Sequence, residues 1–134
     1  NLLDGLDPMI VGGLNNPFKE WIGALIRTDL YGWINPGNPK AAAQMAVRDA
    51  WLSHRRNGLY GAAMSAAMNA MAMVTKDIDQ VLDAGFSVLP PESAIYKACA
   101  LTRELGNSDI DYSHFLSRHH CIYCVKEFVE LRVH

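Results

Sequence analysis

One segment of the sequence, residues 59–74, is apolar on nearly every face that a helix would present. Its apolar residues are mostly alanines and methionines: Ala62, Ala63, Ala66, Ala67, Ala70, Ala72, Met64, Met68, Met71 and Met73. A helix that is hydrophobic all round is buried, and small residues four apart let neighbouring helices approach closely. Methionine fills irregular gaps in cores. The segment therefore predicts the central helix of a helical assembly, with the methionines as core rather than as a metal or cofactor site.

Helix start signals divide the rest of the chain. Asn16-Pro17, Asn38-Pro39 and Pro90-Pro91 each place a cap residue or a proline where a helix can begin. They predict helices near residues 17–34, 39–53 and 91–105. The last of these is expected to face inward with Ala94, Ile95, Ala98 and Leu101. Further helices are expected at 77–88 and from about 110 to the end, after a loop over 1–16. No segment alternates as a strand does, so the predicted class is all-α, with residues 1–134 as one helical domain or a piece of one.

Composition removes several classes of partner. The net charge is −2, and no run is dense in lysine and arginine, which excludes nucleic acid and anionic membrane surfaces. No stretch approaches the 18 uncharged apolar residues of a membrane span. Three cysteines are an odd number and few for a disulfide-rich secreted domain. We expect reduced thiols in a cytoplasmic protein.

The predicted helix at 17–34 carries large apolar residues at three- and four-residue spacing, which predicts a buried stripe. They are Phe18, Trp21, Ile22, Leu25, Ile26, Leu30 and Trp33. Gly23 and Arg27 lie on the opposite side. Glycine in a helix interior costs about 1 kcal/mol relative to alanine. Gly23 therefore indicates a close approach to the backbone, either by a packed helix or by a ligand.

A histidine ends the apolar face of the next predicted helix. Ala43, Val47 and Ala50 share one face of 39–53, and one more turn reaches His54. The chain then runs through Gly58 into the central helix. A glycine-bearing turn before a helix N-terminus can expose backbone N–H groups to a phosphate. The two interpretations of His54 are a core or capping histidine and a residue that contacts a ligand.

Three ordered motifs resemble the ADP-ribosylglycohydrolase family, the relatives of the dinitrogenase reductase-activating glycohydrolase. They are NPFKEWIGALIRTD at 16–29, YGWINPGNP at 31–39 and RDAWLSHRRNGLYG at 48–61. Ala84-Gly85, Leu89-Pro90 and Ser93 follow the same family's pattern. The resemblance covers about residues 12–105. It implies orthogonally packed helices that hold ADP-ribose over two magnesium ions, and hydrolysis of the bond between ADP-ribose and an acceptor.

By position, the resemblance implies a set of substrate-binding residues. His54 would lie at the diphosphate or the adjoining ribose, beside the turn of Gly58, Tyr60 and Gly61. Gly23 and Arg27 match a segment that forms another wall of the same cleft. The ligand would be ADP-ribose or an ADP-ribosylated substrate.

The sequence departs from the family at the metal site. Family metal ligands come from an acidic-Thr segment upstream of the matching stretch and an Asp-x-Asp-Thr segment downstream, and neither is present. Asp77-Ile78-Asp79 and Asp109-Ile110-Asp111 are followed by Gln80 and Tyr112 instead. We therefore assign no metal ligands and no catalytic residues, although the family implies magnesium. The hypothesis is a fragment of a glycohydrolase that is inactive alone and self-associates through exposed apolar surface.

The tail at 107–134 leaves a separate alternative open. It groups possible metal ligands in one short stretch: His114, His119, His120, Cys121 and Cys124. A single Cys-x-x-Cys pair is a weak zinc signal, and the apolar residues around it also predict an amphipathic core helix. The alternatives to the glycohydrolase fragment are thus a non-catalytic helical module that binds ADP-ribose or a nucleotide, and a helical zinc-binding interaction domain.

Overall fold

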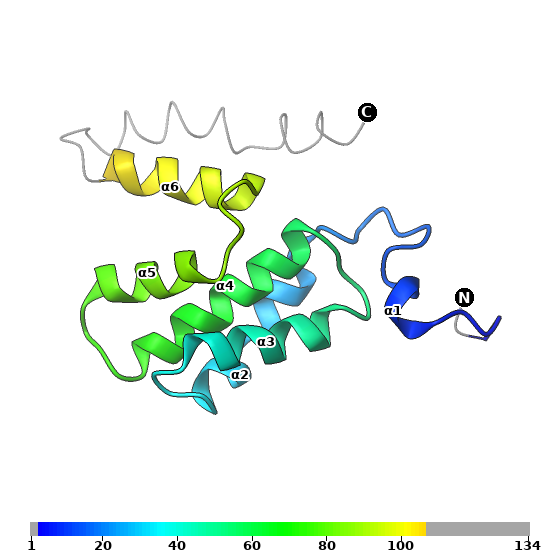
Figure 1. Cartoon of the computed structure of the whole chain (residues 1–134), viewed down its shortest axis with the longest axis horizontal. Coiled ribbons are helices and arrows are strands. Elements are labelled where there is room, and N and C mark those ends of the chain that lie inside the picture. The colour runs from blue at the N-terminus through cyan, green and yellow to red at the C-terminus, as the bar shows by residue number, and fades with distance from the viewer. Residues whose placement is uncertain (1–2, 107–134) are drawn as a thin grey trace. The chain divides into compact units, whose positions relative to one another are not determined.

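The computed structural model describes residues 3–106, and every regular element within that range is helical (Figure 1). In chain order the elements are α1 (Pro8–Val11), the 3-10 helix η1 (Ile22–Arg27), α2 (Asp29–Trp33), α3 (Pro39–Ala50), α4 (Asn57–Ala72), α5 (Ile78–Ser87) and α6 (Ala94–Gly106). Residues Asn1–Lys97 form one compact unit, and Ala98–His134 form a second. The all-α prediction is confirmed. The predicted helix from about 110 to the end lies outside the described residues.

Helix α4 is the centre of the first unit. It packs against α3, α5, α2 and η1, and Figure 1 shows α3 running beside it. Eight of its residues are buried: Gly58, Leu59, Gly61, Ala62, Ala63, Ala66, Ala67 and Ala70. This confirms the central helix predicted from the apolar segment at 59–74.

The helices next to α4 begin where their caps predict. Asn38 precedes α3 and accepts a hydrogen bond from the Ala41 N–H at 3.1 Å, while Pro39 opens the helix. Asp77 caps α5 through the Asp79 N–H at 2.9 Å. Such caps satisfy N–H groups that have no partner inside the helix. They fix the ends of the helices that flank α4.

The segment at 17–34 is not the single helix that its spacing predicts. Residues 17–20 form turns, and η1 and α2 follow, separated at Thr28. The Thr28 hydroxyl donates to the Leu25 carbonyl at 2.9 Å, and its side chain is almost fully buried. A 3-10 helix has three residues per turn and is used in short pieces, so the 3.6-residue spacing of an α-helix does not continue through η1.

The predicted buried stripe of 17–34 is also wrong. Six of its seven members are more than half exposed: Phe18, Trp21, Ile22, Ile26, Leu30 and Trp33. The buried positions are instead the small residues Ala24, Thr28 and Gly32. A Cβ on Gly32 would lie 2.9 Å from the Ala70 backbone nitrogen of α4. Small side chains face the core because the backbone of this segment lies directly against α4.

Two further expectations need correction. The loop predicted for 1–16 contains one helical turn, α1, because Asp7 accepts from the Met9 N–H at 2.8 Å and Pro8 opens the turn. In α6, Ala94 and Leu101 were expected to face inward, and both are exposed. The apolar spacing of α6 therefore does not mark a fully buried face.

Candidate binding site around His54

The loop between α3 and α4 carries His54. The backbone N–H groups of Ser53 and His54 both donate to the Ala50 carbonyl, at 3.0 and 2.8 Å. The next N–H, that of Arg55, crosses to the Lys19 carbonyl at 2.7 Å. These bonds hold the loop against both the end of α3 and the segment before η1.

His54 is 8% exposed, and its imidazole lies between two glycines. A Cβ on Gly23 would lie 3.3 Å from Nε2, and a Cβ on Gly58 would lie 3.0 Å from Cδ2. The close approach predicted at Gly23 is therefore made by the histidine ring. Two segments that are far apart in the sequence, η1 and residues 54–58, meet at this point.

Polar groups line the other edge of the imidazole. Nδ1 of His54 is 2.8 Å from the Ser53 hydroxyl. Burial lowers the pKa of His54 below its ordinary value of 6.5, the Arg27 charge lowers it further, and the Asp49 carboxylate opposes the shift. His54 is therefore neutral at physiological pH.

The residues Gly23, Ser53, His54 and Gly58 form the His54 cluster. Arg27 lies at the edge of this cluster, and 43% of its side chain is exposed. Its Nε donates to a carboxylate oxygen of Asp49 at 2.7 Å, and its terminal nitrogen lies 3.5 Å from the Ser53 hydroxyl. The guanidinium thus keeps a solvent-facing edge near His54. Such an edge can bind an anion with charge-assisted hydrogen bonds.

The N-terminus of α4 is already capped by a carboxylate. Glu20 accepts from the Asn57 amide at 2.8 Å and from the Asn57 backbone N–H at 3.4 Å, while the Gly58 N–H donates to the Arg55 carbonyl at 3.1 Å. Sequence reasoning placed a phosphate at this turn and missed Glu20. Asn57 and Gly58, like Tyr60 and Gly61 after them, belong to α4 rather than to a free turn. The first two N–H groups of α4 therefore have acceptors within the chain.

Tyr60 and Gly61 lie further along α4. Tyr60 is half-buried, and Gly61 faces Leu25, whose Cδ1 would be 3.1 Å from a Cβ at that position. The structure thus brings together four of the six predicted residues, Gly23, Arg27, His54 and Gly58. It places Tyr60 and Gly61 beside them on α4.

Arg55 ties the N-terminal segment to the loop that carries His54. Its guanidinium donates to the carbonyls of Trp51, His54 and Met9, the last two at 2.6 and 2.5 Å, and stacks 4.9 Å above the Trp51 ring. Gly12 leaves the space that the guanidinium fills. Sequence reasoning missed this contact because nothing in the local pattern pairs residue 9 with residue 55.

The family model of the ADP-ribosylglycohydrolases matches residues 4–126. This chain belongs to the ADP-ribosylglycohydrolase family. No curated protein and no solved structure matches it. The match includes the whole described cluster around His54, so the resemblance drawn from the three ordered motifs is confirmed.

The magnesium that the family implies does not fit the described residues of this ADP-ribosylglycohydrolase family member. No three side chains of histidine, cysteine, aspartate or glutamate lie together in residues 3–106. We therefore derive no step through a metal ion. The possible zinc ligands at 114–124 lie outside the described residues. Among the described helices, none is long and apolar enough to cross a membrane.

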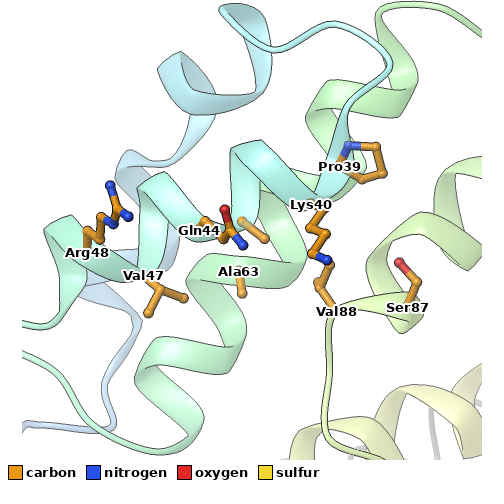
Figure 2. Close-up of a pocket in the computed structure, with 9 residues that line it drawn as sticks. Pro39, Lys40, Gln44, Val47, Arg48, Ala63, Ser87 and Val88 are labelled. Carbon is orange, nitrogen blue, oxygen red and sulfur yellow. The ribbon is translucent and has the colours of Figure 1, made fainter.

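A separate groove of about 660 Å³ lies between α3, α4 and α5 (Figure 2). Apolar side chains such as Val47, Ala63 and Val88 line it together with Lys40 and Arg48. None of the six predicted site residues is among its lining residues. The groove is thus distinct from the His54 cluster.

Proposed function

We propose that this chain supplies an ADP-ribose-binding wall of a hydrolase that cleaves the glycosidic bond between ADP-ribose and an acceptor. The observation that carries the proposal is the meeting of Gly23, His54 and Gly58, with Arg27 at the rim, in a member of the ADP-ribosylglycohydrolase family. These residues come from η1, the α3–α4 loop and the start of α4.

The chemistry of the cluster suits a diphosphate. Arg27 offers a fixed positive charge with an exposed edge, and charge-assisted hydrogen bonds to phosphate oxygens are stronger than neutral ones. His54 is neutral and acts as a hydrogen-bond partner rather than as a second cation. Because Glu20 caps the N-terminus of α4, we assign the phosphate to Arg27 and His54 rather than to the N–H groups of residues 57 and 58.

In this proposal the glycines leave space for the His54 imidazole and do not themselves contact the ligand. Gly23 and Gly58 let the imidazole lie against two backbone segments. A Cβ on Gly23 would stand 3.3 Å from Nε2, and a Cβ on Gly58 would stand 2.6 Å from the Lys19 carbonyl oxygen and 3.0 Å from Cδ2 of the ring. Tyr60 and Gly61 continue the same wall along α4. In this proposal the described residues bind and orient ADP-ribose, and the fragment does not turn over substrate by itself.

Calorimetric titration of the full chain with ADP-ribose tests the proposal. We expect binding, and we expect Arg27→Gln to weaken it about tenfold or more, since hydrogen bonds to charged groups contribute about 1.5–3 kcal/mol. Lys40→Gln is the matched control, because Lys40 lines the separate groove and none of the six site residues does.

The outcomes separate the candidate functions. No binding of ADP-ribose, or an equal loss in the two variants, contradicts the proposed site. If the chain binds ADP-ribose but does not release it from a modified-arginine substrate, the result supports a glycohydrolase fragment that is inactive alone. The same result also fits the non-catalytic module that binds ADP-ribose. Release of ADP-ribose by this chain with magnesium would show that the inactive-fragment hypothesis is wrong.

A further inference from the structure

The Ser53 hydroxyl lies between the rim arginine and the buried histidine. Its oxygen is 3.5 Å from the terminal nitrogen of Arg27 and 2.8 Å from Nδ1 of His54. Arg27 is itself held by Asp49 at 2.7 Å. The four side chains form one continuous series of polar contacts that ends on the imidazole.

What each group can donate limits the direction of each hydrogen bond. A guanidinium has no acceptor, so Arg27 donates to the Ser53 oxygen. Within residues 3–106, the Ser53 hydroxyl has one acceptor in reach for its own proton, Nδ1 of His54. Nδ1 accepts that proton only if it carries none itself, so a donating Ser53 selects one of the two ring tautomers that the 2.8 Å contact allows.

In the tautomer with an accepting Nδ1, the single N–H of the neutral imidazole lies on Nε2. That donor is buried, and within the described part of the chain it has no acceptor. Nε2 faces the missing side chain of Gly23, where a Cβ would stand 3.3 Å away. An unpartnered buried donor is costly unless a partner arrives from outside.

We propose that Ser53 is a positioning residue that fixes His54 as the Nε2–H tautomer, so that this N–H is presented beside Gly23 to an oxygen atom of the ligand. Asp49 takes part by holding Arg27 against the Ser53 hydroxyl. The identity of the ligand oxygen as a phosphate oxygen of ADP-ribose rests on the proposed function. The tautomer assignment does not, because it is argued from the contacts of Ser53 and His54 and involves no ligand atom.

Long-range proton–nitrogen correlation spectra of the full ¹⁵N-labelled chain read the tautomer directly, with the His54 signals assigned from a His54→Gln sample. At a pH above 7.5, we expect protonated Nε2 and unprotonated Nδ1, with the Nδ1 resonance displaced by the hydrogen bond it accepts. In Ser53→Ala the Nδ1 resonance should return toward that of an unbonded nitrogen. Ser53→Thr keeps the hydroxyl and should resemble the unmodified chain.

A proton on Nδ1 in the unmodified chain overturns the proposal without any variant. An Nδ1 resonance that Ser53→Ala leaves unchanged also overturns it. For the ligand, we expect Ser53→Ala to weaken ADP-ribose binding about fivefold, the effect of one hydrogen bond, and Ser53→Thr to restore it. A chain that binds no ADP-ribose but shows the predicted tautomer contradicts the proposed function and supports the role of Ser53.

Discussion

At the scale of single residues, the sequence predicted which positions are unusual better than it predicted their partners. Gly23 was expected to allow a close approach, and the approaching group is the His54 ring. Ser53, Asp49 and Glu20 escaped notice because their partners lie 22 or more residues away or depend on the path of a loop. Ser53 and His54 are neighbours in the sequence, but only the fold brings Arg27 close to them.

The lowered pKa of His54 predicts a pH dependence of stability. The unfolded chain binds a proton at His54 near 6.5, and the folded chain binds it only at lower pH. The contribution of His54 to stability is therefore fully present above 6.5. It is lost as the pH falls from 6.5 through the lowered folded pKa.

Denaturant unfolding at pH 7.5 and at successively lower pH checks this expectation. The free energy of unfolding of the unmodified chain should fall more steeply below pH 6.5 than that of His54→Gln. The histidines at 107–134 are present in both chains, so their contributions to the pH dependence of stability cancel in the comparison. An equal slope in the two chains, or a His54 proton resonance that titrates above 6.5, contradicts the assignment.

At the scale of helices, the chain builds its core from small residues. Seven alanines and Leu59 form one buried cluster that joins η1, α3 and α4: Ala24, Ala42, Ala46, Ala50, Ala62, Ala66 and Ala70. The alanine pattern of 59–74 was enough to predict α4 as a central, closely packed helix. Residues 17–34 were assigned the wrong buried face because the prediction ranked side chains by size. Close backbone packing against α4 instead selects Ala24, Thr28 and Gly32.

An enlarged side chain in this core should therefore be destabilising. Ala66 is 0% exposed, and a leucine there has no space beside the neighbouring helices. We expect Ala66→Leu to lower the free energy of unfolding by about 1–3 kcal/mol, the usual effect of overpacking.

Ala72→Leu is the matched control, since it adds the same atoms at an exposed position of the same helix. We expect it to change stability by no more than about 0.5 kcal/mol. Thermal or denaturant unfolding measures both variants. Equal effects of the two substitutions would show that the alanine contacts are not tightly packed.

At the scale of the first compact unit, the small core leaves large apolar side chains outside. In the segment 18–34, seven large apolar residues are each more than half exposed: Phe18, Trp21, Ile22, Ile26, Leu30, Trp33 and Ile34. Half of the residues of the central helix α4 are buried, so the large exposed apolar side chains gather on 18–34 instead. A contiguous apolar patch of more than a few hundred Å² marks an interaction surface or an aggregation site.

We predict that the chain self-associates through the exposed face of 18–34. Light scattering coupled to size exclusion should show a mass above one chain that rises with concentration. Ile26→Glu places a charge on this face at a side chain that is 65% exposed, so it should shift the chain toward the monomer without disturbing the core.

Ile78→Glu is the control, because Ile78 is equally exposed, at 66%, but opens α5 rather than lying in 18–34. The prediction is wrong if the unmodified chain is a monodisperse monomer that unfolds cooperatively and binds no hydrophobic dye. The seven large exposed side chains would then not drive self-association. If Ile78→Glu alone produced the monomer, the association would run through α5 instead.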